Sequence, residues 1–99
     1  MNIRISSIRF NADKNLTSFI KSRVNKLIQV YDSIIKAEVF LRLDKSHDLE
    51  NKVAEIKVTM PGNQLFAKKQ CKSFEEATDN AVDALRKQIK KHKEKSRVS

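Results

Sequence analysis

Apolar residues recur along this chain with two different periods, and each period predicts a different secondary structure. Residues 3–10 alternate apolar and polar side chains until the alternation changes phase near Ser7, which predicts a short strand. In residues 14–30 the apolar side chains recur at steps of three and four, which predicts a helix with one apolar face. Asp13 stands directly before this segment and is a residue type that often caps a helix. The chain is therefore expected to begin with a strand followed by a helix.

Two further segments alternate between apolar and polar side chains, so residues 37–44 and 53–60 are predicted to be half-buried strands. The inward positions of the first of them are Ala37, Val39, Leu41 and Leu43. The polar stretch between the two segments has no period, which predicts a loop. Pro61 and Gly62 follow the second segment, and they suit the two central positions of a type II turn. We therefore expect a hairpin over residues 53–72.

A second, longer helix is predicted to begin after Ser73, because Glu76 stands where a capping box requires an acid. Its apolar face consists of Phe74, Ala77, Ala81, Val82, Leu85, Ile89 and His92. The order of elements predicts an α+β fold, a β-α-β-β-β-α sandwich in which a four-stranded sheet carries two helices on one face. We expect a single domain over residues 1–95, with a short C-terminal tail at 96–99.

Charge narrows the class of partner. The 99 residues contain 21 Lys and Arg against 12 Asp and Glu, a net charge of +9, which points to a polyanion and above all to nucleic acid. No apolar run is long enough for a membrane span or a secretory signal. We therefore expect a soluble cytoplasmic protein that does not act at a membrane.

The residue types that carry most catalytic chemistry are scarce. One cysteine, Cys71, cannot form a disulfide within the chain, and His47 and His92 do not complete a zinc-ligand pattern with it. One glycine cannot form a phosphate-binding glycine-rich loop. Neither a nucleophile with a base nor paired carboxylates stand out. The sequence therefore predicts a protein with no catalytic residues, no metal, no cofactor and no small-molecule substrate.

Positive charge is concentrated at the C-terminal end. From residue 84 to 99, seven basic residues stand against one acidic residue. Helical spacing arranges them in two stripes, Arg86/Lys90/Lys93/Arg97 and Lys87/Lys91/Lys95. A helix dipole favours bases near the C-terminus, but two or three would satisfy it, and the others repel one another unless a polyanion binds. A solvated cationic face is the alternative to phosphate binding.

The first helix adds two cations whose role the sequence leaves open. Arg23 and Lys26 lie on the flank of its apolar stripe beside Phe19. They can cover the edge of the core with their aliphatic stems, or they can extend the cationic surface of the second helix if the two helices lie side by side. His92 falls on the core side of the second helix, where it either packs or contacts RNA.

The second helix also carries a family pattern. Asp83, Leu85, Lys87-Gln88, Lys91-His92-Lys93 and Lys95 fit the pattern Asp-x-Leu-x-Arg-Gln-x-x-Lys-His-Lys-x-Lys, with lysine for arginine at Lys87. The first-helix segment from Arg23 to Leu27 fits a basic-x-x-Lys-Leu pattern. In both, the chain resembles the ribosome hibernation promoting factor and ribosome-associated inhibitor protein Y family, in its short form. The resemblance covers nearly the whole chain.

This resemblance implies a translation inhibitor that binds the small ribosomal subunit where messenger and transfer RNA would sit, and that stores ribosomes inactive under stress or in stationary phase. The RNA contacts carried over by position are Arg23, Lys26, Lys87, Lys91, Lys93 and Lys95, with Arg86, Lys90 and His92 as auxiliary contacts. Ala84 departs from the family, in which many members carry lysine there. The short form is expected to be a monomer when free and not to pair ribosomes unaided.

A double-stranded-RNA-binding domain is the alternative interpretation. Lys68, Lys69 and Lys72 precede the last helix, as a basic cluster does in such domains. However, those domains dock a positive helix N-terminus on phosphates, and Glu75 and Glu76 would repel them here. The same lysines can instead keep an edge strand from pairing with other chains.

Overall fold

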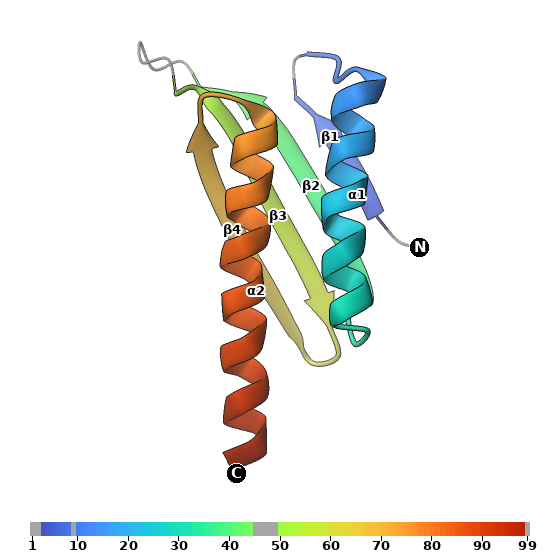
Figure 1. Cartoon of the computed structure of the whole chain (residues 1–99), viewed down its shortest axis with the longest axis vertical. Coiled ribbons are helices and arrows are strands. Elements are labelled where there is room, and N and C mark those ends of the chain that lie inside the picture. The colour runs from blue at the N-terminus through green and yellow to red at the C-terminus, as the bar shows by residue number, and fades with distance from the viewer. Residues whose placement is uncertain (1–2, 9, 45–49, 99) are drawn as a thin grey trace.

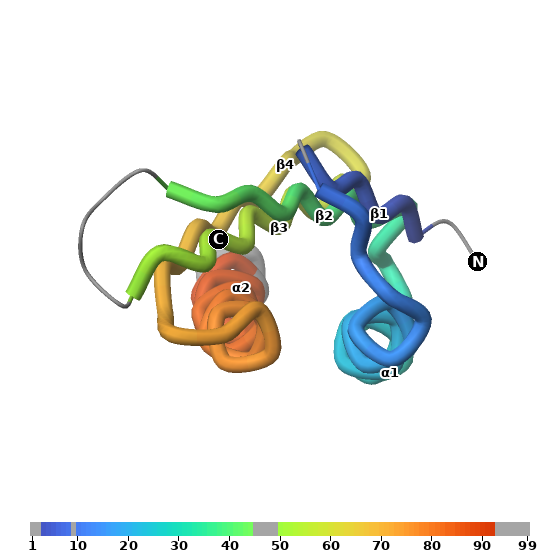
Figure 2. The backbone as a smooth tube through the Cα atoms, turned by 90° about the horizontal axis from the view of Figure 1, so that it is seen from above, coloured from blue at the N-terminus to red at the C-terminus, as the bar shows by residue number. Residues whose placement is uncertain are grey.

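Two helices cover one face of a four-stranded sheet in the computed structural model of the chain (Figure 1). The structure describes residues 3–8, 10–44 and 50–98, of which 93–98 are placed as helix backbone only. The elements are β1 (Ile3–Ser7), α1 (Lys14–Val30), β2 (Lys36–Leu43), β3 (Lys52–Met60), β4 (Asn63–Cys71) and α2 (Phe74–Val98). Seen from above, both helices lie beneath the sheet, and no described element covers the opposite face (Figure 2). The predicted α+β fold is confirmed.

The strands lie in the order β1-β2-β3-β4. β1 pairs with β2 in parallel, so α1 is the crossover that such a connection requires. The other two pairings are antiparallel. Met60 pairs with Asn63 across the predicted two-residue turn, where Gly62 has a φ of +73°. Only glycine adopts that backbone conformation without strain, which explains the single glycine of the chain.

Both helices begin at the residues that the sequence indicates. The Oδ1 atom of Asp13 accepts a hydrogen bond of 2.8 Å from the backbone N–H of Leu16 at the start of α1. The hydroxyl of Ser73 accepts one of 3.1 Å from the backbone N–H of Glu76 at the start of α2. Each cap satisfies an N–H group that the helix itself leaves without a partner.

The core lies between the sheet and the two helices. It is formed by alternate residues of the strands and by the apolar faces of the helices, with Ile20, Val24, Leu27, Val39, Leu41, Ile56, Val58, Leu85 and Ile89 fully buried. One inward position was predicted wrongly, because Leu43 is 49% exposed. It is the last residue of β2, and alternation determines the face of a strand but not how far the covering helices extend.

α2 extends well beyond the sheet, at the end where the chain terminates (Figure 1). Its buried side chains run from Phe74 to Ile89, and the helix backbone continues to Val98. The basic C-terminal segment therefore projects from the sheet instead of folding back on it. In the part of the chain that the structure describes, no helix has both the length and the apolar character needed to cross a bilayer.

Candidate nucleic-acid interface

A groove of about 260 Å³ separates the two helices. It is lined by Arg23, Lys26, Asp79, Val82, Asp83 and Arg86. The cationic flank of α1 therefore faces α2, as expected if the two helices lie side by side on the sheet. Because Arg23, Lys26 and Arg86 come from two different helices, the fold brings three cations together in one groove, beside the two carboxylates of Asp79 and Asp83.

Arg23 is held in this groove by two contacts. Its Nε atom lies 3.0 Å from Oδ1 of Asp79, and its guanidinium carbon lies 4.8 Å from the centroid of the Phe19 ring. Both members of the ion pair are nearly half exposed, at 40% and 47%, so the pair adds at most about 1 kcal/mol to stability. Its main effect is to orient a planar guanidinium group, the geometry that binds phosphate with two parallel hydrogen bonds.

Lys87 makes a weaker contact of the same kind. Its Nζ atom lies 3.4 Å from Oδ2 of Asp83, one turn earlier on α2, and both side chains are largely exposed. An exposed pair of residues i and i+4 contributes about 0.3–0.5 kcal/mol. A phosphate can therefore replace this carboxylate at little cost.

The basic residues of α2 lie on two flanks of the helix. Arg86 lines the groove on the α1 side, and Lys90 follows it by one turn. On the other side, Gln88 donates a 3.0 Å hydrogen bond to the backbone carbonyl of Phe66 in β4, and Lys91 follows Gln88 by three residues. Lys26, Arg86, Lys90 and Lys91 are all exposed, and none of them forms an ion pair with a carboxylate among the described residues.

The remaining candidate residues are placed differently. His92 is half-buried, and its Nδ1 atom lies 3.5 Å from Nδ2 of Asn63, at the start of β4. It therefore lies beside the β3–β4 turn and not in the groove between the helices. Lys93 and Lys95 belong to the α2 backbone, but their side chains lie outside the described residues.

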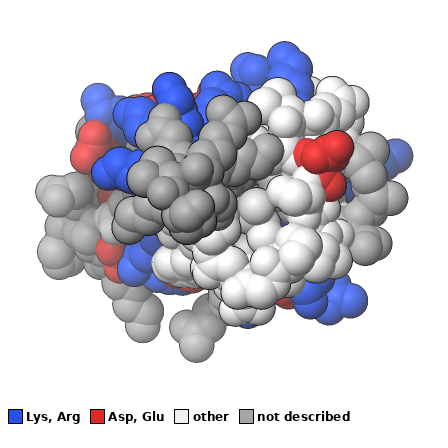
Figure 3. Space-filling model, turned by 90° about the horizontal axis from the view of Figure 1, so that it is seen from below, with Lys and Arg blue, Asp and Glu red and all other residues white. Residues whose placement is uncertain are grey.

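The charge distribution is visible at the end of the molecule where α2 terminates. Figure 3 shows Lys and Arg side chains gathered at its upper left, whereas the right half of this view is mostly white, with separate groups of charged side chains at the top, the right edge and the lower right. In this view the positive charge is thus densest on the side that carries α2, although smaller groups of Lys and Arg side chains lie elsewhere on the surface. A polyanion that approaches this end meets most of the visible positive charge on one side.

The two acidic residues that line the groove, Asp79 and Asp83, were not among the site residues predicted from the sequence. Asp79, Val82, Asp83 and Arg86 follow one another at steps of three, one and three, so they share one flank of α2. That spacing could have identified the flank that faces α1. The presence of Asp79 and Asp83 could not have shown which cations they pair with, because that depends on how the two helices are placed.

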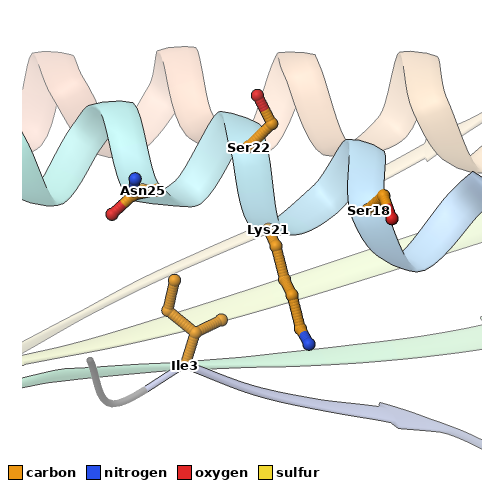
Figure 4. A pocket seen from close by; sticks show the side chains of 5 residues that line it. All are labelled: Ile3, Ser18, Lys21, Ser22 and Asn25. Carbon is orange, nitrogen blue, oxygen red and sulfur yellow. The ribbon is translucent and has the colours of Figure 1, made fainter.

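A second hollow, of about 590 Å³, lies between β1 and the outer side of α1. It is lined by Ile3, Ser18, Lys21, Ser22 and Asn25. Figure 4 shows that these side chains do not converge, since Lys21 extends toward the sheet and Ser22 points away from it. Across the described ranges, no group of three or more His, Cys, Asp and Glu side chains is placed to hold a metal ion. The groove between the helices therefore remains the better candidate site.

Comparison with known proteins agrees with this architecture. Residues 3–97 match the family described as sigma 54 modulation protein / S30EA ribosomal protein. Two curated relatives are called ribosome hibernation promoting factor. The one from Pseudomonas putida is 27% identical over 96% of this chain and 89% of its own length. The one from Klebsiella oxytoca is 23% identical over 96% of both chains.

Two solved structures have the same fold. A ribosomal subunit interface protein from Coxiella burnetii superposes with a TM-score of 0.83, at 17% identity, over 94% of this chain and 98% of that one. The N-terminal domain of protein Y from Thermus thermophilus gives a TM-score of 0.78, at 25% identity, over 93% of this chain and 99% of that domain.

Proposed function

Because the chain belongs to the sigma 54 modulation protein / S30EA ribosomal protein family, we propose that it binds the small ribosomal subunit through the surface formed by α1 and α2. In this proposal it occupies the channel for messenger and transfer RNA and keeps ribosomes inactive under stress or in stationary phase. It acts in the cytoplasm as a monomer that binds and does not catalyse. The names of the curated relatives, ribosome hibernation promoting factor, support this role.

One observation carries the proposal: the fold brings Arg23 and Lys26 of α1 together with Arg86 of α2 in a single groove. Lys90 and Lys91 continue the positive charge toward the projecting end of α2. Such an arrangement suits a folded RNA that presents phosphates along a ridge, because cations on both walls of the groove reach the same backbone. Lys87, Lys93 and Lys95 are proposed to extend the contact.

A channel site agrees with the shape of the molecule. The long axis measures 46 Å and the other two measure 27 and 18 Å, and α2 accounts for the elongation. A slender body with a cationic end can enter a cleft lined by ribosomal RNA. By its volume it would then exclude messenger or transfer RNA from the same cleft.

A general double-stranded-RNA-binding domain is the second candidate, favoured by one observation. Lys68 and Lys69 are exposed on β4, and Lys72 is exposed just before α2 begins. That alternative predicts that these three lysines dominate binding. The first turn of α2 carries Glu75 and Glu76, which oppose a phosphate at this helix N-terminus.

The two candidates are separated by co-sedimentation with purified bacterial small subunits in the presence of excess free duplex RNA. We expect the chain to stay on the subunit, because the groove matches a particular arrangement of ribosomal phosphates. Loss of the chain to the duplex would contradict our proposal and support a general RNA-binding domain.

The channel itself is tested with subunits loaded beforehand with messenger RNA and initiator transfer RNA. We expect loaded subunits to bind the chain much more weakly than empty ones, since both ligands would occupy the same space. Equal binding to loaded and empty subunits would place the site elsewhere on the subunit.

A further inference from the structure

The face of the sheet that the helices leave open carries a half-exposed aromatic ring. Phe66 of β4 is 52% exposed, while its neighbours Leu65 and Ala67 point toward the core. Across the strand pairing, Phe66 lies opposite Lys57 of β3. Lys68 follows Phe66 by two residues and therefore shares its face. The ring thus has one lysine across the strand pairing and another along its own strand, on an open sheet surface.

The charges on this open face are unevenly compensated. Its basic residues are Arg4, Lys36, Arg42, Lys57 and Lys68, and its acidic residues are Glu38 and Glu55. Glu55 forms an ion pair with Arg42, and Glu38 lies 3.9 Å from Lys36. Arg4, Lys57 and Lys68 form no ion pair with any carboxylate in the described ranges. Lys57 lies opposite Glu38 and Lys68 lies opposite Glu55 in the strand register, but these two carboxylates pair with Lys36 and Arg42 instead, so the two lysines beside Phe66 keep their positive charge available.

The other apolar side chains of this face are more buried than the alternation along the strands indicates. Val53 belongs to this face, yet it is only 1% exposed, in register with Arg42 on one side and Gln70 on the other. Phe40 is half-buried. Among the large apolar side chains in the described part of this face, Phe66 is therefore the most exposed to solvent.

The backbone at Phe66 is also held in place by a contact from α2. Its carbonyl accepts the 3.0 Å hydrogen bond from Gln88 of α2, and its strand is paired to β3 along its length. A ring on a fixed backbone loses little conformational freedom on binding, which is an advantage for a contact surface.

We propose that this open face is a second RNA-binding surface, on which an unpaired base of single-stranded RNA stacks on Phe66 while Lys57 and Lys68 contact the flanking phosphates. A sheet with an exposed aromatic ring and nearby cations is a known platform for unpaired bases, because every base presents a flat π-face. A duplex keeps its bases stacked inside and offers no such face. Arg4 extends the positive charge toward β1.

This surface lies on the opposite side of the sheet from the groove between α1 and α2 (Figure 2). It therefore goes beyond the proposed ribosome-binding function, and its test does not depend on ribosomes. One molecule could hold ribosomal RNA with its helices and an unpaired strand with its sheet.

The direct test is Phe66→Trp in the full chain, which contains no other tryptophan. The probe is a single-stranded RNA of about 10 nucleotides, within the range of site sizes of such platforms. We expect saturating RNA to quench the indole fluorescence of F66W and a duplex of the same sequence to leave it unchanged. No quenching, or equal quenching by the duplex, would overturn the proposal.

A second F66W protein that also carries Lys87→Gln and Lys91→Gln separates the two surfaces. Because both lysines lie on α2, we expect the same quenching at saturation as in F66W alone. Loss of the quenching in this protein would mean that the RNA sits on the helices, which would overturn the proposal whatever happens to ribosome binding.

Affinity measurements complete the test. Phe66→Leu keeps an apolar side chain on β4 but removes the stacking face, so we expect roughly 5- to 150-fold weaker binding of the single strand by fluorescence anisotropy. Lys68→Gln is expected to weaken binding several-fold, whereas the matched Lys14→Gln at the start of α1 leaves it near that of the unchanged chain. Unaltered affinity of F66L, or equal effects of K68Q and K14Q, would contradict the proposal.

Discussion

The binding of the small subunit should depend steeply on salt, and the structure gives the magnitude. Four exposed cations, Lys26, Arg86, Lys90 and Lys91, form no ion pair with a described carboxylate and can each neutralise a phosphate directly. Arg23 and Lys87 are already paired with carboxylates and must exchange them for phosphates. The cations whose side chains the structure describes therefore neutralise between about four and six phosphates, and the proposed contacts of Lys93 and Lys95 would add to this number.

With the coefficient for duplexes, four to six contacts correspond to a slope of about −3.6 to −5.4 in a plot of log affinity against log salt concentration. Between 50 and 200 mM salt, the affinity for the subunit should then fall roughly 150- to 2,000-fold. Changing Lys90 and Lys91 together to Gln should make the slope shallower by roughly two, because two contacts are lost.

The assay is sedimentation of the fluorescently labelled chain with purified small subunits in a potassium chloride series at constant magnesium. The double variant is compared with Lys14→Gln/Lys21→Gln, which removes the same charge from exposed positions of α1 away from the groove. A slope near zero, or the same slope for both double variants, would refute the assignment of the phosphate contacts.

Three further predictions concern the stability of the fold that positions the site. Leu85→Ala should lower the free energy of unfolding by about 2–5 kcal/mol in urea titrations, because Leu85 is fully buried, and a loss below 1 kcal/mol would contradict its place in the core. Ser73→Ala should lower the free energy of unfolding by about 1 kcal/mol, because the α2 cap is lost. Ser73→Asp should change it little, because the Asp side chain can still accept the hydrogen bond. Equal losses in the two variants would refute the cap. Gly62→Ala should cost about 1 kcal/mol from backbone strain alone, since no atom lies within 4 Å of the added methyl group, and an unchanged melting temperature would argue against the positive φ.

The strands and helices could be predicted because each keeps one period over its whole length. The three- and four-residue steps of residues 14–30 gave the bounds of α1, and Pro61-Gly62 gave the turn between β3 and β4. Asp13 and Ser73 marked the helix starts because their side chains bond backbone groups only three residues away. Local features of this kind depend on the neighbouring sequence and little else.

Features that depend on how the elements pack together could not be read from periodicity. The pairing of Arg23 with Asp79 needs the distance between two helices that are far apart in the sequence. The exposure of Leu43 and the burial of Val53 depend on which neighbours cover the two ends and faces of the sheet. The groove could be anticipated only on the condition that α1 and α2 lie side by side, which a period of 3.6 residues does not determine.

The central claim, that the groove between α1 and α2 binds the small subunit, is tested most directly by a pair of charge reversals. Arg86→Glu/Lys90→Glu reverses two exposed cations on the groove side of α2, and Lys14→Glu/Lys21→Glu reverses two exposed cations of α1 outside the groove. Circular dichroism first verifies that both proteins keep their helices, and sedimentation then measures how much of each stays with the subunits at 100 mM salt, a concentration between the two salt limits considered above. We predict that the first protein is lost from the subunits and the second stays bound. Equal retention of both folded proteins would contradict the claim.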